Sequence, residues 1–436
     1  MTIIGMQVLF DKTQTQDLLS AMPISPQLQI NSDRLKADFE ELSDIGATVG
    51  GGVSRLALSN EDLEARAWFA NRVEEAGMMI RDDEVGNLSG VYLCSDPDAK
   101  TLLIGSHLDS VPNGGRFDGA LGVLVGLECI RRIKEENIEL PVHLEVIDFT
   151  DEEGTWLSFF GSLGLTGMLT EAHWNDTTED NGAFRVALFR AGIRPAEVRR
   201  AHRTDKEIVA YLELHIEQSE VLAKAEKQIG IVTKIVGRTT YNFNFYGEAT
   251  HAATTSRDEQ RDALQAAARF ITGMHSMAVE QYPGGVFNCG NVTVEPGAYN
   301  VVPEVTSLQV ELRHYDETIL KEMESQIVRL AHEIARDYRV TVGTQQVLHR
   351  SVADMNPEMQ TVIEQVCEKQ GRTHMPIISY AGHDAQILSK TCPCAMIFVP
   401  SQGGISHSPK EFTGWQDIEA GANVMLETIL RLANSS

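Results

Sequence analysis

The spacing of apolar residues predicts alternating strands and helices in the first third of the chain. Leu63, Phe69 and Val73 fall near one helical face after Asn60, a suitable N-cap, and Gly77 is a suitable stop. Mostly apolar runs bounded by turn residues predict strands, and another apolar stretch predicts a helix. The order is strand 88–94, strand 101–106, helix 120–134 and strand 142–149. Strands that alternate with helices indicate an α/β layer structure.

The pattern changes near Gly230. Tyr241, Phe243 and Phe245 alternate with polar residues and predict a strand over 234–246. The following segments predict a helix over 258–280, strands over 286–294 and 305–313, a helix over 317–338 and a strand over 339–348. The order β-α-β-β-α-β is the signature of a ferredoxin-like unit.

We therefore predict a small ferredoxin-like domain inserted into a larger α/β domain. The predicted boundaries are 1–231 for the first part of the larger domain, 232–348 for the inserted domain and 349–436 for the second part. The second part is expected to end with a helix over about 415–432.

Composition narrows the classes of partner. The chain has 436 residues, enough for two domains, and its 37 Lys and Arg against 62 Asp and Glu give a net charge of −25. That charge argues against nucleic acid and anionic membranes as partners, and favours either an acidic surface or carboxylates gathered around cations. Residues 1–14 lack the pattern of a signal peptide, and no run of about 18 apolar residues occurs, so we expect a cytoplasmic protein. The six scattered cysteines are expected to be free thiols.

The segment GSHLDSVPNGGRFDGALG, residues 105–122, holds the strongest local signal. It places His107, Asp109 and Asp118 in one transition from strand to loop to helix. The carboxyl end of a strand in an α/β sheet is where binding sites are usually built. We therefore expect these side chains to be ligands in a binding site at this end of the strand.

Three further segments carry residues of the same kinds. In DFTDEEG, 148–154, an apolar strand ends in three consecutive acids, which repel one another unless solvent or cations offset the charge. If one of these carboxylates coordinates a metal, its neighbour is free to act as a base. His215 lies in LELHIEQ, 212–218, and His407 lies in the glycine-rich VPSQGGISHSP, 399–409.

Each segment alone has an ordinary explanation: a polar loop, a solvated acidic turn, a core histidine or a surface histidine. Together they favour a metal site, because imidazole and carboxylate ligands suit zinc, manganese or cobalt. Five such ligands at separate strand ends can hold two ions that share one carboxylate. We predict two divalent metal ions per subunit.

The order of the motifs resembles the M20 metallopeptidase and amidohydrolase superfamily over nearly the whole chain. Within it, the sequence is similar to N-carbamoyl-L-amino-acid hydrolases and allantoate amidohydrolases. The motifs that carry the resemblance are H-x-D at 107–109, D-G-A at 118–120, D-E-E-G at 151–154, H-I-E-Q at 215–218, G-x-x-x-H-A at 247–252 and S-H-S-P at 406–409. The resemblance implies a catalytic domain with an inserted lid and dimerisation domain, and a homodimer.

The resemblance also assigns roles in the larger domain. It implies five metal ligands, namely His107, Asp118, Glu153, His215 and His407. Asp118 would bridge the two ions, Glu152 would be the general base, and Asp109 would orient the imidazole of His107.

Further residues are expected to contact the substrate. By resemblance, His251 stabilises an oxyanion, Asn300 and Arg313 grip the substrate carboxylate, and Gln218 lies near the carbamoyl group. Arg313 also has its own argument, because a guanidinium offers a carboxylate two parallel donors. His383 is expected to support the site. His251 belongs to the inserted domain, so it must reach the metals either by domain closure or from a partner subunit. The resemblance favours the partner subunit.

These residues predict metal-dependent hydrolysis of the ureido C–N bond of N-carbamoyl-L-amino acids, giving the amino acid, ammonia and carbon dioxide. Alternatives are allantoate or a related ureido acid as substrate, a dipeptidase or aminopeptidase of the same superfamily, and an inactive metal-binding scaffold. The chain departs from the usual pattern at Ser219, Ala253, Ser256 and the run Thr155–Leu157. These departures spare every proposed ligand and concern the choice of substrate.

Overall fold

The computed structural model of the chain describes residues 28–170, 173 and 180–435. Residues 1–14, on which the expectation of no signal peptide rests, lie outside the described residues. None of the described helices is both long and apolar enough to span a membrane. All six cysteines are described, and they are free, as predicted.

The larger domain is built on a mixed sheet in which nine strands are described. Their order is β1-β2-β4-β3-β5-β13-β6-β11, and β12 also pairs with β6. The strands are β1 (Met79–Asp82), β2 (Leu88–Tyr92), β3 (Thr101–His107), β4 (His143–Phe149), β5 (Ile208–Ile216), β6 (Ile229–Ile235), β11 (Ala353–Asp354), β12 (His374–Ser379) and β13 (Cys394–Val399). The neighbouring pairs β4–β3, β3–β5 and β5–β13 are parallel, so their carboxyl ends lie at one edge.

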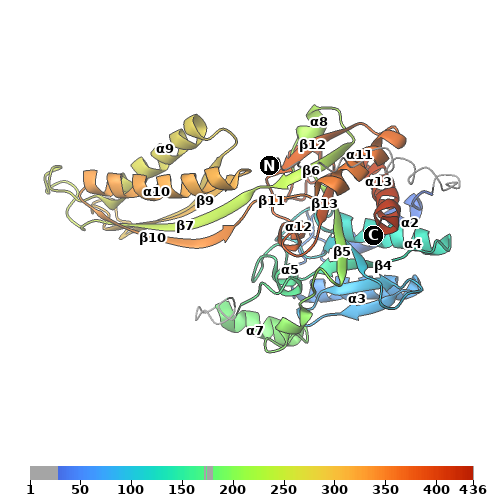
Figure 1. Cartoon of the computed structure of the whole chain (residues 1–436). Coiled ribbons are helices and arrows are strands. Elements are labelled where there is room, and N and C mark those ends of the chain that lie inside the picture. The colour runs from blue at the N-terminus through green and yellow to red at the C-terminus, as the bar shows by residue number, and fades with distance from the viewer. Residues whose placement is uncertain (1–27, 171–172, 174–179, 436) are drawn as a thin grey trace, which may run out of the picture.

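Helices cover both faces of this sheet (Figure 1). They are α2 (Ser32–Asp44), α3 (Asn60–Glu75), α4 (Ala120–Glu135), α5 (Phe160–Leu165), α7 (Asp180–Arg190), α8 (Val221–Lys224), α11 (Pro357–Lys369), α12 (Asp384–Leu388) and α13 (Trp415–Asn434). Every residue of β3 is buried: Leu102 and Ile104 belong to one apolar cluster, and Leu103 belongs to another. A parallel strand covered on both faces reads as a continuous apolar run, which is why the sequence predicts it well.

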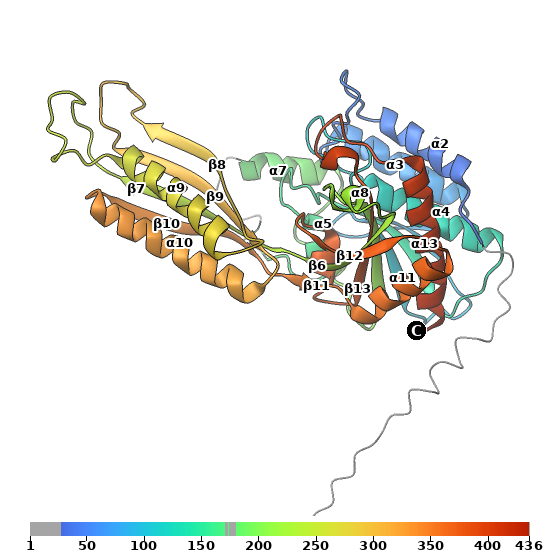
Figure 2. The same ribbon diagram turned by 90° about the horizontal axis from the view of Figure 1, so that it is seen from above.

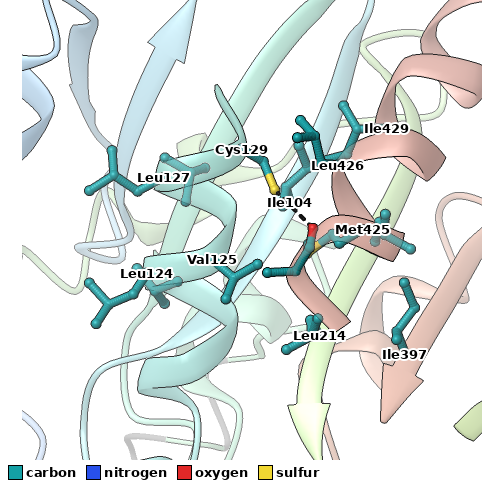
Figure 3. Close-up of a cluster of buried hydrophobic side chains, with 14 of the residues drawn as sticks. Ile104, Leu124, Val125, Leu127, Cys129, Leu214, Ile397, Met425, Leu426 and Ile429 are labelled. Carbon is teal, nitrogen blue, oxygen red and sulfur yellow. Dashed lines mark hydrogen bonds between the residues drawn. The ribbon is translucent and has the colours of Figure 1, made fainter. Parts of the chain in front are cut away.

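The main core lies between the central strands and two long helices. Figure 3 shows Val125 and Cys129 of α4 close to Met425 and Leu426 of α13, with Ile104 of β3 beside them. These five side chains are fully or almost fully buried. Burying side chains of this size stabilises a fold by about 1.5–3 kcal/mol each, so this packing holds β3 and β5 in place beneath the site.

A second, antiparallel sheet forms the inserted domain, and its strand order is β10-β7-β9-β8. Its elements are β7 (Gly237–Tyr246), α9 (Ala263–Gln281), β8 (Val286–Glu295), β9 (Val305–His314), α10 (Glu317–Asp337) and β10 (Thr341–Arg350). Phe243 and Phe245 pack against Phe270 of α9, with ring centroids 4.7 and 5.7 Å apart. The predicted fold class and the β-α-β-β-α-β order are confirmed. We call residues 237–350 the lid domain, which extends away from the larger domain as an elongated arm (Figures 1 and 2).

One predicted strand is wrong in extent. Residues 234–246 do not form a single strand, because β6 ends at Ile235 in the large sheet and β7 begins at Gly237 in the small one. Only the buried Val236 separates the two strands, so apolar alternation alone cannot reveal that the chain changes sheets here. The return link from Arg350 of β10 to Ala353 of β11 is also short. The lid domain is thus tied to the larger domain by two short links.

The first helix of the lid domain begins later than predicted, at Ala263 and not at residue 258. The side chain of Asp262 accepts hydrogen bonds from the backbone N–H groups of Leu264 and Gln265. This is the geometry of an N-cap, which fixes the start of a helix.

Candidate metal centre

The predicted metal ligands meet at one edge of the large sheet. His107 is the last residue of β3, Glu153 lies in the turn after β4, His215 lies near the end of β5, and His407 follows β13. These four strands are parallel neighbours, so their ends converge. Asp118 joins them from the turn that leads into α4.

The two carboxylate oxygens of Asp118 face different groups. Its Oδ1 lies 3.1 Å from Nε2 of His215 and 3.7 Å from Nε2 of His107. Its Oδ2 lies 3.4 Å from Nε2 of His407, which is also 3.5 Å from Oε1 of Glu153. Asp118 therefore stands between two sets of donors, one with His107 and His215 and the other with Glu153 and His407.

The donor atoms fit divalent metal ions. His107, Asp118 and His215 offer ligand atoms within 4.8 Å of one another, and so do Asp118, Glu153 and His407. Imidazole nitrogens and carboxylate oxygens are the donors that zinc, manganese and cobalt accept. The residues present thus match the chemistry that the sequence predicts.

Gly119 shapes the turn that delivers Asp118. Its φ of 64° lies in the left-handed region, and a Cβ atom there would stand only 2.3 Å from Cε1 of His107. A residue with a side chain would therefore strain the backbone and displace the imidazole. The same turn begins α4, whose buried face anchors it to the core.

The acids of the centre are held near one another away from water. Burial raises the pKa of Glu152 well above its ordinary value, and the charge of Glu153 adds to the effect. Burial likewise raises the pKa of Glu153 to about 7, with a contribution from Asp118. The hydrogen bond with Asp118 raises the pKa of His407 to about 9. Burial lowers the pKa of His107, but nearby acids, Glu152 foremost, outweigh it and raise that pKa well above its usual value.

Asp109 supports the acidic turn as well as the imidazole. Its carboxylate accepts hydrogen bonds from the backbone N–H groups of Glu152 at 3.3 Å and Glu153 at 3.2 Å. Nδ1 of His107 lies 3.0 Å from the backbone oxygen of Asp109 and 3.6 Å from its Oδ1. The residue therefore links the end of β3 to the turn after β4.

Glu411 and Ser406 complete the support, and the sequence did not single them out. Oε1 of Glu411 accepts hydrogen bonds from the backbone N–H groups of Phe117 at 2.9 Å and Asp118 at 3.0 Å. The Ser406 hydroxyl lies 2.8 Å from Oδ2 of Asp118 and 3.1 Å from Oε2 of Glu411. Their positions beside His407 in S-H-S-P-K-E were the available signal.

A cavity of about 370 Å³ opens onto the five proposed metal ligands and Glu152, and it is also lined by Gln218, His383 and Arg313. Nε2 of Gln218 donates to Oδ2 of Asp118 at 2.8 Å, while its buried Oε1 has no partner among the described residues. Burial lowers the pKa of His383 well below its usual value, so its imidazole is neutral. A second cavity of about 790 Å³ shares Gln218, Arg313 and His407 with the first.

His251 and Asn300 lie elsewhere in this chain. Both are exposed, and they sit in the loops after β7 and β8, at the end of the lid domain farthest from the larger domain (Figure 1). The two loops are joined by the hydrogen bond from the backbone N–H of Ala252 to the oxygen of Asn300 at 3.0 Å. The structure therefore brings together the ligands, Glu152, Gln218, Arg313 and His383, and leaves these two residues apart.

Comparison with known proteins places this site in a family. Residues 103–431 match Peptidase family M20/M25/M40. The chain belongs to the M20 family. This M20 chain is 35% identical to N-carbamoyl-L-amino acid amidohydrolase of Geobacillus stearothermophilus, covering 93% of the chain and 99% of the relative. It is 31% identical to allantoate amidohydrolase of Bacillus subtilis strain 168, covering 91% and 96%.

A solved structure of a related amidase has a similar fold. An amidase of the hydantoinase/carbamoylase family from Burkholderia multivorans superposes with a TM-score of 0.82 at 33% identity, covering 94% of this chain and 99% of that one. The resemblance inferred from motif order is confirmed, and the M20 chain is a hydrolase. M20 enzymes are metal-dependent, which agrees with the candidate ligand groups.

Proposed function

We propose that this M20 enzyme hydrolyses the ureido C–N bond of N-carbamoyl-L-amino acids, giving the free amino acid, ammonia and carbon dioxide. The observation that carries the proposal is the placement of Asp118 between two sets of metal donors, beside Glu152 and in one cavity with Arg313. The relatives named as N-carbamoyl-L-amino acid amidohydrolases support the choice of substrate.

Two divalent ions of zinc, manganese or cobalt would be held at this centre. His107, His215 and Asp118 would hold one ion, and Asp118, Glu153 and His407 would hold the other. When bound, such ions supply Lewis acidity, which lowers the pKa of a water molecule and polarises a carbonyl oxygen.

Glu152 is the proton carrier of the proposed reaction. Its carboxylate takes a proton from the attacking water and returns it to the leaving nitrogen of the ureido group. Burial raises the pKa of Glu152, which makes it easier for this carboxylate to hold the proton between the two steps. Asp109 keeps Glu152 in place through the hydrogen bond to its backbone N–H.

Other side chains would bind and orient the substrate. Arg313 would pair with the α-carboxylate, and the free Oε1 of Gln218 can accept a hydrogen bond from the carbamoyl N–H₂ group. The neutral His383 lies in the same cavity and would support the bound ureido group.

We further propose a homodimer in which His251 and Asn300 of one subunit complete the site of the other. The exposure of both residues at the far end of the lid domain supports this arrangement. From there, His251 would stabilise the developing oxyanion and Asn300 would add a donor to the substrate carboxylate.

Allantoate amidohydrolase is the second candidate, because the Bacillus subtilis relative carries that name and the proposed metal chemistry is the same. A panel of N-carbamoyl-L-amino acids, allantoate and dipeptides, assayed with added manganese, cobalt or zinc, separates the alternatives. Release of ammonia and free amino acid from the N-carbamoyl compounds is the expected result. Turnover of allantoate or dipeptides alone would replace the proposed substrate, and no turnover of any compound with any metal would overturn the proposed activity.

A further inference from the structure

Three arginines form a row where the lid domain joins the larger domain. In the small sheet, Arg350 of β10 stands opposite Arg238 of β7, and Arg238 stands opposite Arg313 of β9. Residues directly opposite on antiparallel strands point to the same face of the sheet. All three side chains line the cavity that contains the metal centre. One wall of this cavity therefore carries three guanidinium groups.

The described residues place only one carboxylate against these three cations. Glu311 lies with Oε1 2.7 Å from Nε of Arg313 and with Oε2 2.6 Å from Nε of Arg238. Arg313 also donates to the backbone oxygen of Tyr380. Within the described chain, the side chain of Arg350 has no hydrogen bond and no ion pair. Glu311 can neutralise one of the three positive charges, so two have no paired carboxylate among the described residues.

Holding these charges together costs free energy. Like charges directly opposite in a sheet are destabilising, and Arg350 is half-buried, where an unpaired charge is poorly solvated. Burial lowers the pKa of Arg350, and the charge of Arg238 lowers it further. Burial and then the charge of Arg350 also lower the pKa of His173. Among the described residues only Glu311 forms ion pairs with these arginines, so a bound anion would offset the remaining positive charge.

We propose that Arg238 and Arg350 bind a second negatively charged group of the substrate, beside the α-carboxylate held by Arg313. The inference rests on the proposed function and narrows its substrate class to ureido acids with a side-chain carboxylate, such as N-carbamoyl-L-glutamate. Opposite residues in a sheet have Cβ atoms about 4.5–5.5 Å apart, which is comparable to the separation of two carboxylates in one amino acid. Each carboxylate would then meet its own guanidinium group.

A pair of substrates that differ only in this charge tests the proposal. N-carbamoyl-L-glutamate and N-carbamoyl-L-glutamine have the same shape, and the intact metal-loaded enzyme should favour the glutamate compound by about 10-fold or more in kcat/KM, because hydrogen bonds to charged groups are the stronger ones. In Arg350→Gln this ratio should fall toward one, mainly through a higher KM for the glutamate compound. Arg336→Gln is the matched control, because it removes the same charge from an exposed position on α10 of the same domain.

The outcomes are distinguishable. Equal kcat/KM for both compounds in the parent enzyme overturns the second anion site but leaves ureido hydrolysis standing. A ratio that Arg350→Gln does not change, or that Arg336→Gln changes as much, also overturns it. Failure to hydrolyse any N-carbamoyl compound instead overturns the proposed function. A ratio that persists in Arg350→Lys and falls in Arg350→Gln would show that the positive charge is what selects the substrate.

Discussion

Metal binding to the metal-free protein should strengthen by at least about tenfold for each unit of pH between 7 and 9. His407 alone accounts for a change of about tenfold per unit, because its hydrogen bond with Asp118 raises its pKa to about 9 in the absence of metal. His107, whose pKa the nearby acids also raise, adds to the dependence. A histidine must be neutral to coordinate a metal ion, so the ion has to displace this proton. The raised pKa means that the proton is bound at neutral pH and is lost as the pH rises through 9.

The magnitude follows from the pKa. At pH 7, two units below the pKa of His407, about 99% of the imidazole is protonated, which weakens the apparent affinity about 100-fold, or about 2.7 kcal/mol. Below pH 7 the slope should steepen, because burial raises the pKa of Glu153 to about 7 and this second ligand also becomes protonated. Above pH 9 His407 is already mostly neutral, so it should add no further gain in metal affinity.

Titration calorimetry with zinc or manganese at pH 8, in two buffers with different protonation enthalpies, counts the protons released. About one proton per subunit from His407 is expected, with a further contribution from His107, and chelator competition from pH 6 to 10 should give the slopes. His332→Gln serves as the control, because His332 is an exposed histidine of the lid domain. Affinity that stays constant between pH 7 and 9, with no proton released, would refute the reasoning.

Three experiments test the proposed roles. Glu152→Gln should keep both metals and lose about 100-fold or more of turnover, since an amide cannot accept the proton; metal content and activity are measured on one sample, and activity within a few-fold of the parent would remove Glu152 as the base. Arg313→Lys should weaken substrates with a free α-carboxylate far more than their amides, because lysine lacks the paired donors, and equal losses would contradict this role. Glu152→Ala and His251→Ala, each inactive alone, should regain activity when refolded together, because one site of a mixed dimer then carries neither change; mixed dimers that form and stay inactive would reject action from the partner subunit.

The residues of the candidate metal centre could be proposed from the sequence because they lie in short local motifs. His107 and Asp118 sit in one short segment, and the acids after β4 follow directly from a buried strand. In a parallel α/β sheet such strand ends meet at one edge. Their meeting can therefore be predicted without knowing which strands pair. Glu411 was missed because an acid on a loop is common, and only its hydrogen bonds to the turn at Asp118 distinguish it.

The arginine row was not predictable from the sequence, because it depends on strand register. Arg238 and Arg350 lie at opposite ends of the lid domain in sequence, and they become neighbours only when β7 pairs with β10. Apolar alternation predicts which face of a strand is buried, but it does not specify which residues stand opposite each other. The change of sheet at Val236 was missed for a similar reason, because pairing partners decide which sheet a strand joins and the local sequence does not show them.

In the proposed reaction, the two short links between the domains would also set the order in which groups reach the substrate. Any rotation of the lid domain about these links moves residues beside them least, and Arg238 and Arg350 lie beside them, whereas His251 lies at the far end and sweeps the widest arc. The arginine row therefore stays next to the candidate metal centre when the lid domain rotates. In the proposed reaction, an anionic substrate would be captured and aligned by the arginines before the distant groups arrive, so recognition by charge would precede assembly of the complete site.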